Sequence, residues 1–205
     1  MRLIKMLGLA AISAMAATAL IGVSSAAAST ALCKESANPC PPGQLVTEYH
    51  LLAENVTILT STVNFSCAET LLKGTLLGLG SPQVGHITAF TFTECKTELG
   101  TPCSVSAVLL GLMNFSQTGK NKGEVSFEKT SLEYECGSYI NCAYGGLPEL
   151  TILSVLGASL PTHAGLVQAN GVKLAEDLNH SHGICPKVAK WDALYEFSED
   201  TYVME

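Results

Sequence analysis

His86-Ile-Thr-Ala-Phe-Thr-Phe-Thr-Glu-Cys95 is the stretch that indicates the fold of this 205-residue chain. It is followed by a short loop and then by Cys103-Ser-Val-Ser-Ala-Val108. Phe90 and Phe92 fall on one face at period two, the spacing of a β-strand. The other face, with Ile87, is also mostly apolar or small, which predicts a central strand. The stretch therefore predicts strand, loop and strand, with a cysteine on each side of the loop.

Short β-rich runs recur along the rest of the chain. Val, Ile, Thr and aromatic residues favour strands, and turn signals follow one another about every 8 to 12 residues, which is typical of an all-β sandwich or barrel. Strands are predicted at residues 45–52, 56–67, 68–79, 86–95, 105–112, 124–129, 131–136, 150–156, 166–169, 172–175, 189–197 and 202–204. We expect a disulfide-stapled antiparallel β-sandwich, with a β-barrel as the alternative.

Three local patterns sharpen this prediction. Gly74 and Gly78 would each cost about 1 kcal/mol in a helix, so residues 68–79 are interpreted as a strand in which glycine permits close backbone approach. Asn170-Gly171 predicts a two-residue hairpin turn. In residues 131–136, Leu, Tyr and Cys point to the core, and the alternating Ser131, Glu133 and Glu135 point to water.

Residues 1–28 have the pattern of a secretory signal peptide. Arg2 and Lys5 precede an uncharged apolar run, and Ala26 and Ala28 are the small residues that signal peptidase requires. The alternative is an uncleaved anchor, since the apolar run is nearly long enough to span a bilayer. Cleavage would leave residues 29–205, enough for one all-β domain, in a secreted, extracellular or cell-envelope protein.

The charge of the chain excludes several partners. The formal net charge is −7, and loss of Arg2 and Lys5 would make it −9. Arg2 is the only arginine, so the mature chain lacks the side chain that grips phosphates and carboxylates bidentately. Nucleic-acid binding needs a basic surface. We therefore expect no nucleic-acid partner, and no membrane association after cleavage.

All eight cysteines lie beyond residue 28, an even number that indicates disulfides in an oxidising compartment. A zinc site would favour Cys-x-x-Cys spacing, which is absent. The short spacings favour Cys33–Cys40 as a loop lock, with Cys95–Cys103 and Cys136–Cys142 as hairpin clasps. Elimination then pairs Cys67 with Cys185, although the sequence alone permits many other pairings.

One cluster could hold a metal ion. Asp177, His180 and His182 offer oxygen and imidazole ligands. The competing interpretation is a polar, solvated loop that leads into a disulfide, and it is preferred, so we expect no metal and no cofactor.

Catalytic motifs give no positive indication. Gly-x-Ser-x-Gly and His-Glu-x-x-His are absent, and the frame Gly80 to Gly85 is followed by His86-Ile87 where a phosphate-binding loop needs Lys-Ser/Thr. A pair of carboxylates for glycoside hydrolysis stays open, since it is assembled in space. Trp191, Tyr195 and Phe197 share one face of the last long strand, where they form either core or a platform that stacks on sugars.

The motifs together resemble a family. They are a leader, an early Cys-x6-Cys, Phe90-Thr-Phe-Thr-x-Cys95, Tyr134-x-Cys136, Cys142-x-Tyr144 and Cys185-Pro-x3-Lys-Trp-x-Ala-x-Tyr195. This combination is similar to secreted proteins of unknown function in soil actinobacteria. The resemblance implies secretion and a β-rich domain, and brings no catalytic residues with it.

These observations predict a non-enzymatic extracellular binding or structural module that recognises a glycan or a protein surface. The alternative is a small secreted hydrolase or a hydrolase inhibitor. If function lies near the opening stretch, it belongs to the loop of residues 96–102 and not to the cysteines beside it.

Overall fold

The computed structural model describes residues 29–119, 122–138, 140–145, 151–156, 165–182 and 185–204, without the side chains of residues 122 and 151–156. The predicted signal peptide lies outside them. Within them the chain is all β, in fourteen strands. These are β1 Ala31–Cys33, β2 Glu48–Leu59, β3 Phe65–Leu76, β4 Gln83–Thr93, β5 Lys96–Thr97, β6 Cys103–Leu109, β7 Leu112–Gly119, β8 Lys122–Glu128, β9 Ser131–Cys136, β10 Ile140–Gly145, β11 Thr151–Leu156, β12 Leu166–Ala175, β13 Val188–Phe197 and β14 Tyr202–Met204.

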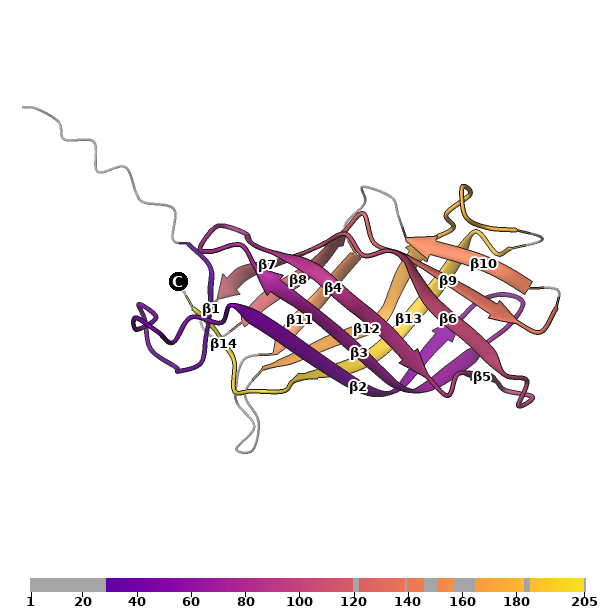
Figure 1. Ribbon diagram of the computed structural model, residues 1–205, viewed down its shortest axis with the longest axis horizontal. Helices are drawn as coiled ribbons and strands as arrows, with labels where there is room; N and C mark the ends of the chain where they lie inside the picture. The colour runs from indigo at the N-terminus through magenta and orange to yellow at the C-terminus, as the bar shows by residue number, and fades with distance from the viewer. Residues whose placement is uncertain are drawn as a thin grey trace, which may run out of the picture.

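Twelve of these strands form one curled antiparallel sheet that closes on itself, and β1 and β14 form a separate two-stranded sheet (Figure 1). In the order β2, β3, β4, β7, β8, β11, β12, β13, each strand pairs with the next, and β13 pairs back with β2. Closure satisfies backbone groups that an open sheet edge would leave unpaired. The all-β, antiparallel prediction is confirmed. The curled sheet fits either expected description, because its opposite walls pack across one core as sandwich layers do.

Several of the shorter strands are halves of longer ones. β6 and β7 run end to end along one edge of β4, with Thr91 opposite Ser106 and His86 opposite Leu112. β8 and β9 continue each other in the same way beside them. The break between β6 and β7 falls at Gly111, whose φ of 57° suits glycine. The predicted single buried strand over residues 105–112 is therefore wrong, and Leu109 is 40% exposed.

Aromatic side chains fill the inside of the closed sheet. Trp191 lies 5.8 Å, between ring centroids, from each of Phe90, Phe127 and Tyr195. The inward face predicted for the last long strand is confirmed, since Ala189, Trp191, Ala193, Tyr195 and Phe197 are all buried.

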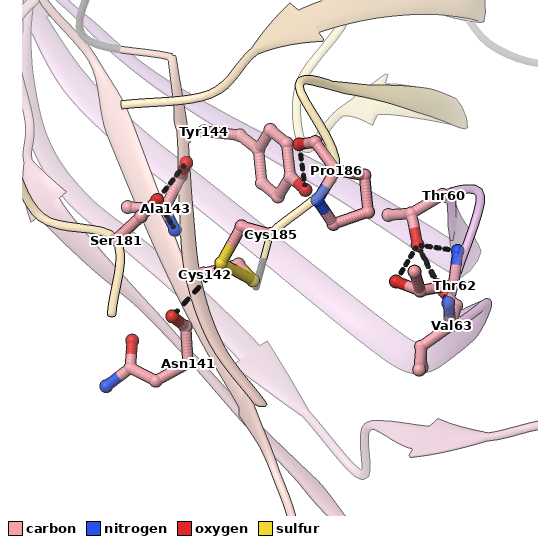
Figure 2. The surroundings of a disulfide bond; sticks show 10 residues. All are labelled: Thr60, Thr62, Val63, Asn141, Cys142, Ala143, Tyr144, Ser181, Cys185 and Pro186. Carbon is pink, nitrogen blue, oxygen red and sulfur yellow. Dashed lines mark hydrogen bonds between the residues drawn. A yellow bond between two sulfur atoms is a disulfide. The ribbon is translucent and has the colours of Figure 1, made fainter. Parts of the chain in front are cut away.

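Residues 56–67 contain a turn between two strands and are not the single strand predicted. β2 ends at Leu59 and β3 begins at Phe65. Thr60 Oγ1 accepts a hydrogen bond from the Val63 amide at 2.9 Å and donates to the Val63 carbonyl at 2.6 Å, as Figure 2 shows. Threonine hydroxyls can hold a turn in this way. The same β-branched residue that suggested a strand closes the turn.

Asn170-Gly171 is a bulge inside β12, and the predicted hairpin there is wrong. Both halves of β12 pair with β13, with a register shift between Ala169 and Val172. Gly171 has a φ of 59°, and its amide donates to Asp192 Oδ1 on β13. A bulge of this kind needs an extra residue with positive φ, as a two-residue hairpin turn does, so Asn-Gly is compatible with either structure.

A second bulge changes the faces of β4. Ile87 and Phe90 are both buried, although the period-two pattern placed them on opposite faces, because the β3–β4 register shifts between Lys73 and Gly74. The central position predicted for this strand is confirmed, since β4 pairs with β3, β6 and β7. The strand predicted over the glycine-rich residues 68–79 is confirmed as far as Leu76, where β3 ends.

β1 and β14 pair with each other and close one end of the sheet (Figure 1). Leu32 is fully buried, and its amide donates to the buried Gln83 Oε1 at 2.8 Å. Thr30 Oγ1 accepts from the Gln117 amide at 3.1 Å. The predicted strand at residues 202–204 is confirmed as β14. We call the β1–β14 pair the plug, because it closes this end of the sheet.

Candidate binding site at the loop end

All eight cysteines are disulfide-bonded, but only one of the predicted pairs, Cys33–Cys40, is correct. The other bonds are Cys67–Cys95, Cys103–Cys136 and Cys142–Cys185. The register of the strands explains the observed pairing. Cys136 faces Cys103 across β6 and β9, and Cys142 lies opposite Tyr134 and not opposite Cys136.

The loop of residues 96–102 is fastened at both ends to different strands. The Cys103 amide donates to the Cys95 carbonyl at 2.8 Å, so the two cysteines do flank a reversal as predicted. Their sulfurs bond elsewhere, to Cys67 on β3 and Cys136 on β9. Both ends of the loop are therefore covalently linked to neighbouring strands.

Hydrogen bonds inside the loop hold its tip. The Thr97 amide donates to the Thr101 carbonyl, and the Gly100 amide to the Thr97 carbonyl, both at 2.9 Å. Asn64, in the turn between β2 and β3, donates from Nδ2 to Glu98 Oε1 at 3.1 Å. This ordered tip presents Leu99, which is 96% exposed.

A hollow of ≈ 250 Å³ lies beside this tip. It is lined by the β2–β3 turn, the loop itself, the end of β9 and the start of β10: Thr62, Val63, Asn64, Thr97, Glu98, Leu99, Thr101, Cys136 and Ile140. The end of the molecule opposite the β1–β14 plug thus combines an exposed leucine, a shallow partly apolar hollow and two disulfides.

The metal candidates are brought together only in part. Asp177 Oδ2 lies 2.8 Å from His180 Nδ1, whereas His182 is exposed and its amide bonds the Asn141 carbonyl at 2.9 Å. In the part of the chain that the structure describes, no three acidic, histidine or cysteine side chains gather as metal ligands do. Asp177 instead accepts from Ser131 Oγ at 2.9 Å.

Ser131, Asp177 and His180 contain the residue types of a catalytic triad in the wrong order. In a working triad the histidine bonds the serine and the carboxylate orients the histidine. Here serine and histidine both bond the same carboxylate oxygen. This arrangement leaves Ser131 without a base to accept its proton. We therefore assign the network a role in stabilising the fold. Ser131 is buried, so the prediction that it faces water is wrong.

This network belongs to a cover over the outer edge of β10. Ser181 Oγ accepts from the Ala143 amide at 3.0 Å and donates to the Ala143 carbonyl at 3.2 Å (Figure 2). The Tyr144 hydroxyl donates to the Pro186 carbonyl at 2.7 Å, and Cys185 bonds Cys142. The polar loop thus blocks an edge that would otherwise invite pairing with another chain. Its role was not predictable from sequence, since its partners lie about forty residues away.

Asp177→Asn is expected to lower the free energy of unfolding by about 1 to 3 kcal/mol at neutral pH. Burial alone would raise the pKa of Asp177, but hydrogen bonds from His180, Ser131 and the Asn179 amide outweigh it and hold the pKa below the ordinary value of 3.8. A depressed folded pKa stabilises above pH 3.8, and that contribution is lost as pH falls further. Denaturant unfolding as a function of pH measures the difference, which should vanish in strong acid.

Glu135→Gln is the matched control, since Glu135 is an exposed carboxylate on β9. It should change stability by less than about 0.5 kcal/mol. An Asp177→Asn protein as stable as the Glu135→Gln protein at neutral pH would contradict the structural role of the network.

A second hollow, of ≈ 180 Å³, lies at the plugged end and contains Glu48 and Glu199 in its lining. Glu199 lies 2.8 Å from the Lys34 ammonium, and the hydrogen bond and charge of Lys34 lower the pKa of Glu199. A glycosidase needs one carboxylic acid whose pKa is raised, so that it donates a proton. The shift of Glu199 has the opposite sign.

The proposed sugar platform is not at the surface. Trp191, Tyr195 and Phe197 have exposed fractions of 2%, 0% and 8%, so they belong to the core.

Among the described residues, no helix is long and apolar enough to cross a membrane.

Comparison of the chain with protein-family models, with curated proteins and with solved structures gave no match.

Proposed function

We propose that the protein is a secreted, non-enzymatic binding module that recognises a protein surface through the tip of the loop of residues 96–102. The observation that carries the proposal is Leu99, a leucine exposed to 96% on a loop anchored by two disulfides. An ordered loop loses little entropy on binding, so it can present a side chain efficiently. Four disulfides are consistent with an extracellular, oxidising environment.

The side chains exposed at the loop tip favour a protein partner over a glycan. Glycan binding by stacking needs exposed rings, and the three aromatic candidates are buried. Leu99 and the hollow beside it supply apolar contact instead. Two exposed glutamates accompany Leu99: Glu98 lies next to it in the loop, and Glu94 lies just before the loop. We infer a partner with an apolar pocket bordered by basic groups, since complementary charges speed association and improve specificity.

Secretion through a cleaved leader and kinship with the secreted actinobacterial proteins are part of the same proposal. The leader pattern of residues 1–28 and the disulfides support both. The hydrolase alternative has less support, since the Ser131–Asp177–His180 network lacks a nucleophile–base pair and Glu199 stays ionised.

A crosslinking experiment tests the proposal. A photo-crosslinking amino acid at position 99 should capture a discrete protein partner from the secreted fraction of the source cells, and the same group at position 79 should not. Leu79 is a suitable control because it is 57% exposed and lies at the plugged end. Equal capture at both positions would contradict the proposal.

The affinity for the captured partner gives the quantitative prediction. Leu99→Ala should weaken binding by about tenfold or more, as expected when an anchoring side chain loses roughly 1.4 kcal/mol. Leu79→Ala should leave the dissociation constant unchanged. Surface plasmon resonance measures both, and thermal unfolding should show that neither variant alters stability. An unchanged affinity for Leu99→Ala would remove Leu99 as the anchor.

A further inference from the structure

The hollow beside the loop tip has a single charged residue in its wall. Of the described residues that line it, only Glu98 carries a charge, and none is basic. Lys96 and Glu94 are both exposed close by in the chain, but neither lines the hollow. A group that enters the hollow therefore meets one negative charge and no positive charge in the wall.

Glu98 is held in place by the turn between β2 and β3. Asn64 Nδ2 donates to Glu98 Oε1 at 3.1 Å, and the Glu98 amide donates to the Asn64 carbonyl at 3.4 Å. Asn64 is itself fixed, since its Oδ1 accepts from the Thr60 amide at 3.1 Å. An ionised carboxylate has about four acceptor sites on its two oxygens. The bond from Asn64 thus orients Glu98 and leaves it able to accept from a cation.

The uncharged part of the wall suits an aliphatic chain. Val63 and Ile140 are partly buried and pack against the core, so they form a firm surface. Leu99 supplies a third apolar side chain. Long cationic side chains bury their methylene stems along such surfaces and keep the charged end near water. The volume of ≈ 250 Å³ lies below the range of about 300 to 1,000 Å³ that holds drug-sized ligands, which favours a single side chain as the occupant.

The contact with Asn64 favours lysine over arginine. Arginine grips a carboxylate best when two parallel N–H groups reach both oxygens. Because Asn64 already donates to Glu98 Oε1, part of that two-point contact is taken. The lysine ammonium is a compact charge that needs only one oxygen.

We infer that the loop-end hollow binds a lysine side chain of the protein partner. The methylene chain of this lysine contacts Val63, Leu99 and Ile140. Its ammonium group pairs with Glu98. The inference rests on the proposed function and makes the contact reciprocal, since Leu99 enters the partner while a lysine of the partner enters the hollow.

A titration with capped amino acids tests the inference. The probes are Nα-acetyl-lysine N-methylamide and its norleucine and arginine counterparts, added to the oxidised, 15N-labelled protein. Norleucine has the straight chain of lysine without the ammonium group. The lysine probe should shift the Asn64 side-chain amide signal saturably. It should bind about fivefold more tightly than the norleucine probe, the upper end for an exposed ion pair, and more tightly than the arginine probe.

Glu98→Gln removes the charge and keeps an oxygen that can accept from Asn64. It should abolish the preference for lysine over norleucine and leave the affinity for norleucine unchanged. Glu196→Gln is the matched control and should keep the fivefold preference. Glu196 is exposed on β13 and precedes Phe197, which lines the hollow at the plugged end.

Four results would overturn the inference: no saturable shift with the lysine probe, equal affinity for lysine and norleucine, tighter binding of arginine, or an unchanged preference in Glu98→Gln. These results do not depend on the crosslinking at position 99. A captured partner without a preference for lysine would reject only this inference. A preference for lysine without a captured partner would reject the proposed role of Leu99.

Discussion

Replacing Cys142 and Cys185 together with alanine is expected to lower the free energy of unfolding by about 4 kcal/mol. This disulfide joins residues 43 positions apart, the longest separation among the four. A crosslink restricts the unfolded chain more when it closes a longer loop. Since a domain of this kind is stable by only about 5 to 15 kcal/mol, the loss is a large part of the total. Equilibrium denaturant unfolding under non-reducing conditions measures it.

The Cys33–Cys40 pair provides the control for loop length. Its cysteines are 7 positions apart, so the same double replacement should lower the free energy of unfolding by only about 2.4 kcal/mol. A larger loss of stability for the Cys33–Cys40 variant than for the Cys142–Cys185 variant would contradict the expected order.

Non-reducing peptide mapping of the unaltered protein should first recover peptides that join Cys67 to Cys95, Cys103 to Cys136 and Cys142 to Cys185.

Gly74→Ala is expected to destabilise the protein by about 3 kcal/mol or more, at the upper end of overpacking effects. A β-carbon at Gly74 would collide with the Tyr49 hydroxyl and with the His86 carbonyl oxygen. The hydroxyl donates to that carbonyl at 3.3 Å, so Tyr49 lies directly over the glycine. Tyr49 is 1% exposed and packs edge-on against Phe115, with centroids 5.5 Å apart. It cannot move aside without opening the core.

Gly119→Ala is the matched control for this substitution. A β-carbon there meets nothing within 4 Å, and the backbone is not in the left-handed region. Its free energy of unfolding should stay within about 0.5 kcal/mol of the unaltered protein. If Gly74→Ala were equally mild in thermal or denaturant unfolding, the close approach of Tyr49 to β3 would be contradicted.

The loop-end surface could be anticipated only in outline. The two flanking cysteines predicted an anchored reversal at residues 96–102, and Leu99 is the single large apolar side chain in it. Its exposure depends on how the loop stands relative to the Asn64 turn, which no local pattern specifies.

Local chemistry determined the all-β class, the inward face of residues 189–197, the close packing at Gly74 and the disulfide state of the cysteines. Each depends on side-chain alternation, backbone freedom or composition, which neighbouring residues carry. Tertiary structure alone decided which cysteines pair, that Asn170-Gly171 is a bulge, and that Ser131 and His180 share the Asp177 carboxylate. These depend on register between strands far apart in the chain, and a shift of one residue reverses every side chain to the other face.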